Sequence, residues 1–189
     1  MRQSTVYVSP WRIDVTVRDG VTTVVSIARL ARAIARGLDA AGAPKPASIG
    51  LILSEDAELA GLNRTHMGAD GPTDVLSFPL LPPEAFPEHP GGPRRPARRR
   101  PRPAGAAAAF IEPPGRRHLG DIVVSVERAL EQASVGRGGQ TGDVRWSPRD
   151  ELCLLVTHGT LHICGWDHAD PDEEAAMRAL EQRLLAEGR

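Results

Sequence analysis

The segment from His158 to His168, HGTLHICGWDH, constrains the fold more than any other part of the chain. Its first two histidines are four residues apart, so both imidazoles lie on one face of an α-helix, roughly 6 Å apart along the axis. Gly165 follows three residues after His162, where a left-handed residue can end a helix and turn the chain back. We therefore expect a helix near the C-terminus whose following turn returns His168 toward the first two histidines.

Three imidazoles grouped in this way predict a site for one zinc ion, held by His158, His162 and His168. Three neutral nitrogen ligands leave the fourth tetrahedral position to water, which is typical of catalytic rather than structural zinc sites. Half of the six histidines of the chain fall within these 11 residues, so a chance grouping of surface or core histidines is the weaker explanation. Cys164 is expected to be a reduced core thiol, as is Cys153, because three better ligands are already present.

The pattern H-x-x-x-H-x-x-G-x-x-H is also the ligand spacing of the metzincin proteases, but Gly159 stands where those enzymes have a glutamate. That glutamate is the general base and proton shuttle of the protease reaction. Since glycine has no group that can take this role, peptide hydrolysis by the metzincin mechanism is not expected.

Hydrophobic periodicity predicts an α+β fold, with a small mixed four-stranded sheet, about five helices and a zincin-like metal helix near the C-terminus. Proline after an N-cap residue marks the start of the last two helices, at Ser147-Pro148 and Asp170-Pro171. The expected strands are 12–17, 48–54, 74–78 and the run LGDIVVSV after His118. The expected helices are 21–41, 56–67, 127–136, 147–164 and 172–187.

A Pro- and Arg-rich segment interrupts what we otherwise interpret as one domain over residues 1–189. Residues 82–105 contain eight prolines and six arginines, a composition that supports neither a helix nor a sheet ladder, so residues 82–117 are predicted to be a disordered insertion. Their net charge is +5 in a chain of net −1, which leaves −6 for the remainder. A broad basic groove for nucleic acid is therefore disfavoured, and the arginine run is either a solvated linker, the preferred interpretation, or a phosphate-binding segment.

The chain offers no sign of a membrane or secretory protein. Its first residues lack a basic start followed by an apolar run, and no apolar stretch approaches the ~20 residues that a membrane helix needs, so a cytoplasmic location is expected. Aromatic residues make up only 4% of the chain, which argues against a base-stacking platform for RNA.

The complete run HGTLHICGWDH resembles the signature of the YbeY endoribonuclease family, HG-x-LH-x-x-G-aromatic-DH. Residues 62–79, LNRTHMGADGPTDVLSFP, are similar to the family segment that ends in TDVLSF, and residues 119–125, LGDIVVS, to its LGDI-x-IS strand. The resemblance implies a small α+β fold and one Zn²⁺ bound by His158, His162 and His168. It further implies cleavage of single-stranded RNA, 3′-end maturation of 16S ribosomal RNA, ribosome quality control, and the small ribosomal subunit as partner, with no organic cofactor and no membrane.

The chain departs from the family pattern at two positions near its presumed RNA contact. Many members have an arginine before TDVLSF that is thought to meet RNA, and here that position is Met67; the lysine often found two residues later is Ala69. Arg64 or the arginine-rich insertion is the remaining source of phosphate contacts in this part of the chain.

No general base is evident from the sequence. Asp167 has three open roles, which are orienting an imidazole, assisting proton transfer and capping backbone amides. We expect Asp74 and Asp121 to be turn or hydrogen-bond anchors rather than acid–base groups, and His66 to lie at the surface. Ser77 is expected either to line a cleft or to occupy an ordinary strand position.

Three functions remain open, with a zinc-dependent endoribonuclease acting on ribosomal RNA as the leading hypothesis. One alternative is a metallohydrolase of another substrate, including a protease with a different base. The other is a non-catalytic ribosome-assembly factor whose metal stabilises the fold, and the loss of basic residues at positions 67 and 69 favours it.

Overall fold

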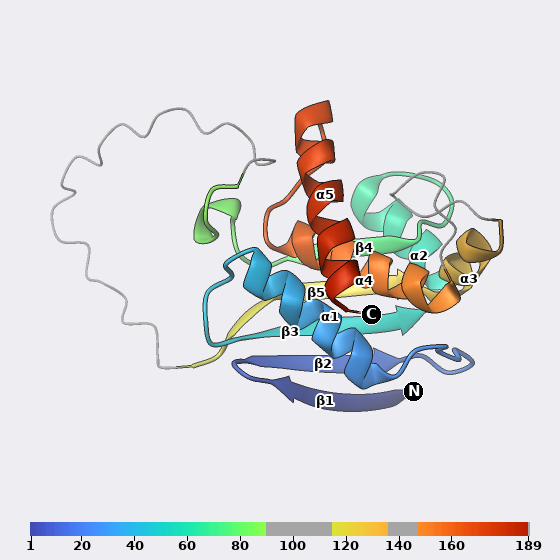
Figure 1. Cartoon of the computed structure of the whole chain (residues 1–189). Coiled ribbons are helices and arrows are strands. Elements are labelled where there is room, and N and C mark those ends of the chain that lie inside the picture. The colour runs from blue at the N-terminus through green and yellow to red at the C-terminus, as the bar shows by residue number, and fades with distance from the viewer. Residues whose placement is uncertain (90–114, 136–146, 189) are drawn as a thin grey trace, which may run out of the picture.

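The computed structural model describes residues 1–89, 115–135 and 147–188, and every element below lies in those ranges. A five-stranded mixed sheet forms one layer of the fold (Figure 1). In spatial order β1-β2-β3-β5-β4, its strands are β1 (Arg2–Val8), β2 (Trp11–Val17), β3 (Ala47–Ser54), β5 (Arg117–Ser125) and β4 (Val75–Pro79). β2, β3 and β5 run parallel, whereas the two edge strands are antiparallel to their neighbours.

Five α-helices are described, together with two short segments of other helix types. The α-helices are α1 (Ile27–Ala40), α2 (Asp56–Leu62), α3 (Val126–Val135), α4 (Pro148–Ile163) and α5 (Pro171–Glu187). A π-helical turn, η1 (Asn63–Met67), continues α2, and a 3₁₀ turn, η2 (Pro83–Ala85), follows β4. None of the described helices has both the length and the apolar character that crossing a membrane requires.

The α+β class and the mixed sheet are confirmed, but the prediction of four strands is wrong because it omits β1. This edge strand has its first five residues exposed or nearly so, and the sequence RQSTVYV lacks the alternation that marks a half-buried strand. It pairs with β2 through a hairpin in which Val8 lies opposite Trp11.

The first helix also begins later than predicted, at Ile27 rather than at residue 21. Ser26 is its N-cap, and the Ser26 side chain accepts a hydrogen bond from the backbone N–H of Arg29. The run VTTVV that precedes it is rich in β-branched residues, which lower helix propensity.

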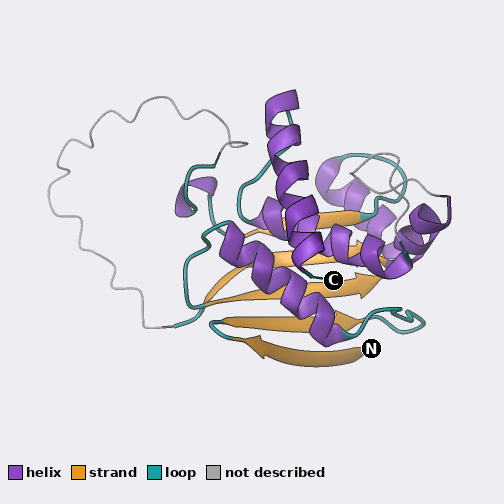
Figure 2. Cartoon of the chain, viewed as in Figure 1, coloured by secondary structure: helices purple, strands orange, loops and turns teal. Residues whose placement is uncertain are grey.

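Helix α4 is the central helix of the layer that covers the sheet. Figure 2 shows α1, α4 and α5 together on one face of the sheet, and α4 contacts β4, β5, α1, α3 and α5. Every residue of α4 from Glu151 to Ile163 is buried except His162. A helix enclosed on all sides needs apolar residues around its whole circumference, as the sequence CLLVTHGTLHI has.

Most of the predicted insertion, residues 82–117, lies outside the described residues, and for those residues disorder stays a prediction. Its described margins are part of the fold. Phe86 is only 4% exposed and belongs to the hydrophobic core, and the His89 ring stacks on Trp166 with centroids 4.0 Å apart. At the other margin, β5 already begins at Arg117.

Candidate metal centre

The end of helix α4 and the turn after it bring the three predicted ligands together. His158 and His162 lie one helical turn apart on α4, which ends at Ile163. Gly165 has a φ of 81°, and the backbone N–H of Trp166 donates to the carbonyl of Leu161, so the chain reverses as the glycine position predicted. His168 then lies against both helical imidazoles.

The imidazole nitrogens lie close enough together that one metal ion could be held by all three rings. The Nε2 atoms of His158 and His162 are 3.0 Å apart, and one nitrogen from each of the three rings lies within 4.8 Å of the others. Two nitrogens bound to the same tetrahedral zinc at ~2.0–2.1 Å are themselves about 3.3 Å apart. His158 is buried, His162 half-buried and His168 exposed, so the group of ligands is closed on the protein side and open on the other.

The environment of His162 favours the neutral imidazole that metal binding needs. Burial, together with the neighbouring His158 and His168, lowers the pKa of His162 to about 4, while Asp167 acts in the opposite direction. His162 is therefore uncharged near neutral pH, and its lone pair is available without the loss of a proton.

A buried carboxylate that was not predicted from the sequence contacts the first ligand. Glu181 on α5 is fully buried, and its Oε1 lies within hydrogen-bond distance of Nδ1 of His158, at 2.7 Å. A signal was present in the sequence, because Glu181 lies four residues after Met177 and three before Leu184, on the inner face of the last helix. A charged residue in such an apolar stripe indicates a specific partner.

The missing glutamate at position 159 has a structural explanation. A Cβ atom on Gly159 would lie 2.7 Å from Cγ2 of Ile122 and 3.1 Å from Cγ2 of Val75. The Ser77 hydroxyl also donates to the Gly159 carbonyl at 3.0 Å. Gly159 thus lets α4 approach the sheet closely, and a glutamate would not fit there.

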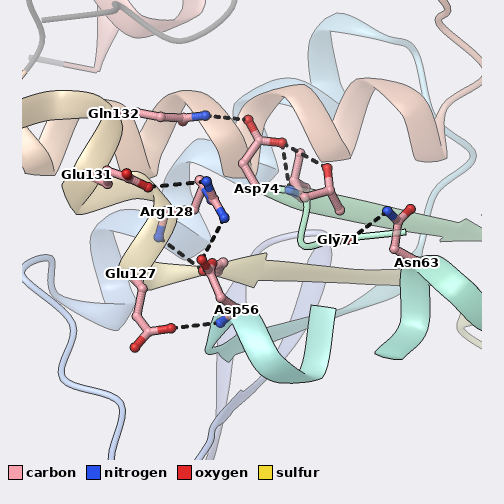
Figure 3. A network of polar contacts seen from close by, with 11 residues as sticks. Asp56, Asn63, Gly71, Asp74, Glu127, Arg128, Glu131 and Gln132 are labelled. Atoms are coloured by element: carbon pink, nitrogen blue, oxygen red, sulfur yellow. Dashed lines mark hydrogen bonds and ion pairs between the residues drawn. The ribbon is translucent and has the colours of Figure 1, made fainter. Parts of the chain in front are cut away.

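Two of the aspartates have the anchoring roles that were expected of them, and one of the open roles of Asp167 is visible. Asp74 Oδ1 accepts from the backbone N–H of Val75, and Asp74 Oδ2 accepts from Gln132 at 3.0 Å (Figure 3). Asp121 contacts Nε2 of His118 at 3.2 Å. Asp167 Oδ1 accepts from the backbone N–H of His168 at 2.8 Å, which makes it a cap of the metal-binding turn.

A polar network fixes the segment that leads into the cleft. Arg128 of α3 donates to Asp56 Oδ2 at 2.8 Å, and the backbone N–H of Asp56 donates to Glu127 at 2.8 Å (Figure 3). At the far end of this segment, Asn63 donates to the carbonyl of Gly71 at 2.9 Å. These contacts tie α2 to α3 and η1 to the loop that follows it, beside the Asp74–Gln132 pair.

The histidines open onto a cleft of about 700 Å³ between the metal-binding turn and strand β4. Met67 and Ser77 line this cleft. Of the two alternatives predicted for Ser77, the cleft-lining one is therefore observed. His66 is exposed, as predicted, and packs edge to face on Phe78. Among the described residues that line the cleft, none is a lysine or an arginine.

Arg64 and Cys164, the two other groups considered from the sequence, do not supply a phosphate contact or a metal ligand in this cleft. Arg64 is exposed and pairs with Asp70 at 3.3 Å. Cys164 is a free thiol whose pKa burial raises to about 12, so the sulfur stays protonated. Cys164 therefore behaves as the core thiol that was predicted.

Comparison with known proteins gives consistent matches over most of the chain. The family model described as Endoribonuclease YbeY matches residues 15–189. The Endoribonuclease YbeY of Salinispora tropica is 42% identical over 158 residues, covering 83% of this chain and 85% of that protein. That of Roseiflexus castenholzii is 33% identical and covers 92% and 90%. A solution structure from Thermotoga maritima aligns with a TM-score of 0.50 at 20% identity, covering 94% of this chain and 88% of the other, and so supports the fold.

Proposed function

Because this chain belongs to the endoribonuclease YbeY family, we propose that it is a zinc-dependent endoribonuclease that cleaves single-stranded RNA. We propose further that it acts in the cytoplasm on the small ribosomal subunit, in 3′-end maturation of 16S ribosomal RNA and in ribosome quality control. The observation that carries the proposal is the group of three imidazoles at the open side of the cleft, with one nitrogen of each within 4.8 Å of the others.

The donor set supports zinc as the bound metal. Imidazole nitrogens suit Zn²⁺ better than Mg²⁺ or Ca²⁺, which prefer oxygen ligands. When bound, a zinc ion with three protein ligands supplies a water of lowered pKa and stabilises negative charge that develops on a phosphodiester. His158, His162 and His168 are the residues that would hold it.

The protein's own contribution is to shape the space beside the metal ligands. Strand β4 forms the wall opposite the metal-binding turn, and its Ser77 is held by the hydrogen bond to Gly159. Asp167 fixes the backbone of His168, so the most exposed ligand is still restrained. A substrate strand that lies in the cleft therefore meets ligands whose positions are set before it binds.

A protease-like mechanism fits this site poorly. The position of the metzincin glutamate is Gly159, and the packing of Ile122 and Val75 against it excludes a carboxylate there. The alternative of a peptide hydrolase would require another base beside the same ligands.

A non-catalytic assembly factor remains the second candidate because the cleft has little positive charge. RNA-binding surfaces neutralise phosphates with lysine and arginine, yet none of the described residues lining this cleft is a lysine or an arginine. The endoribonuclease proposal therefore requires phosphate contacts from the metal and from arginines outside the cleft wall.

Depletion of the protein in its host, followed by sequencing of the 3′ ends of small-subunit ribosomal RNA, tests the proposal. We expect extended 3′ ends that wild-type protein corrects and the His162→Ala variant does not. Full correction by His162→Ala, produced at the wild-type level, would contradict a metal-dependent cleavage and favour the assembly role.

A further inference from the structure

Glu181 is a buried carboxylate at a position where packing alone calls for an apolar residue. It lies on the inner face of α5 between Met177 and Leu184, and the residue is fully buried. A carboxylate is costly to bury unless a hydrogen-bonded partner compensates for the lost water. The identity of that partner therefore indicates what the residue does.

The partner is the most buried of the three candidate metal ligands. Oε1 of Glu181 and Nδ1 of His158 are 2.7 Å apart, and the two side chains are 1% and 5% exposed. Where the carboxylate accepts this hydrogen bond, the proton lies on Nδ1 of the imidazole. The contact thus favours one of the two neutral forms of His158.

That form leaves the other ring nitrogen free to bind a metal. With the proton on Nδ1, Nε2 carries the lone pair, and Nε2 is the atom that lies 3.0 Å from Nε2 of His162. The hydrogen bond also fixes the ring about its Cβ–Cγ bond, so Nε2 stays directed at the metal position.

Support from a carboxylate distinguishes His158 from the other two histidines, because the His162 ring is hydrogen-bonded to the backbone of Trp166 instead. Among the described residues, His158 is the sole member of the three with a carboxylate hydrogen bond from its ring. The acid next to His168, Asp167, caps a backbone amide instead. The second oxygen of Glu181 has no hydrogen-bond partner in the described part of the chain, which a carboxylate placed there for stability alone would be expected to have.

We infer that Glu181 is a positioning residue for the metal site, which holds His158 in the Nδ1–H form and aims Nε2 at the bound ion. The inference rests on the proposed metal site at His158, His162 and His168. It adds the requirement that the C-terminal helix α5, and not α4 alone, determines metal affinity.

The test compares the Glu181→Gln variant with wild-type protein, and with Glu187→Gln as a control at an exposed position of the same helix. Glutamine keeps the size of the side chain, but its amide can either accept from or donate to Nδ1, so it no longer enforces one imidazole form. Zinc affinity is measured by competition with a chelator, the imidazole form of His158 by ¹⁵N NMR of the apoprotein, and the fold by circular dichroism.

We expect Glu181→Gln to weaken zinc binding by about 10- to 100-fold, as loss of a hydrogen bond to a metal-bound histidine typically does, while Glu187→Gln leaves it unchanged. The wild-type spectrum should show a protonated Nδ1 and an unprotonated Nε2 on His158, and Glu181→Gln should show a mixture. Unchanged zinc affinity in folded Glu181→Gln protein would overturn the inference.

The wild-type spectrum decides the question even if the variant does not fold, because a protonated Nε2 on His158 in the apoprotein would also overturn the inference. No readout depends on RNA cleavage. A protein that shows these zinc and NMR results but cuts no RNA would refute the proposed function and leave the role of Glu181 intact.

Discussion

Replacing Gly159 by alanine tests whether this position needs glycine for close packing, apart from the fact that neither residue can act as a catalytic base. The new Cβ would lie 2.7 Å from Ile122, a fully buried residue of the internal strand β5, and 3.1 Å from Val75. Overpacking of this kind costs about 1–3 kcal/mol, while alanine regains about 1 kcal/mol of helix propensity. We expect a net loss of up to about 2 kcal/mol, or a melting temperature lower by up to roughly 8 °C.

Gly61→Ala is the matched control, because Gly61 also lies in an α-helix but a Cβ added there would have no atom within 4 Å. At that position alanine is expected to stabilise the protein by about 0.5–1 kcal/mol. Urea denaturation of both variants measures the two free energies of unfolding. If Gly159→Ala were as stable as Gly61→Ala, close approach of α4 to the sheet would not explain the glycine.

Three further predictions concern the margin of the insertion, a surface ion pair and the arginine run. Phe86→Ala should lower the free energy of unfolding by about 3–5 kcal/mol, since the ring is in the core; unchanged thermal unfolding would show that the segment does not belong to the fold. The hydrogen bond from Arg18 lowers the pKa of Glu58 below its ordinary value of 4.5, so Glu58→Gln should reduce stability at pH 7 and have little effect once the pH is below the lowered pKa of the folded state; an equal loss at both pH values would contradict this. Serine in place of six arginines should weaken RNA binding and reduce the slope of log affinity against log salt concentration by about 0.7 for each phosphate that is no longer neutralised. An unchanged slope would show that these arginines do not contact RNA phosphates. The six are Arg94, Arg95, Arg98, Arg99, Arg100 and Arg102.

The metal helix could be predicted from the sequence because its determinants are local. Histidine spacing, the N-cap pair Ser147-Pro148 and the left-handed Gly165 are all read within 22 residues, and the structure has each of them as expected. The same holds for the start of α5 at Asp170-Pro171. Local hydrogen bonding and backbone conformation decide these features without help from the rest of the fold.

The features that could not be predicted in this way depend on contacts between distant segments. Strand β1 has little apolar pattern of its own and is held by its ladder to β2. Glu181 meets His158 across 23 residues, and the packing at Gly159 involves β4 and β5. Predicting each of these features requires knowing how distant elements are placed relative to one another. Hydrophobic periodicity along a single segment does not provide that information.

Cleavage of single-stranded RNA by the purified protein, stripped of metal and then reloaded with one equivalent of zinc, tests the central claim most directly. We predict no cleavage by the apoprotein, recovery on addition of zinc, and loss of both zinc and cleavage in His162→Ala, with His118→Ala as a histidine control outside the cleft. Cleavage that persists in the metal-free protein or in His162→Ala, or its absence from zinc-loaded wild-type protein, would contradict the account.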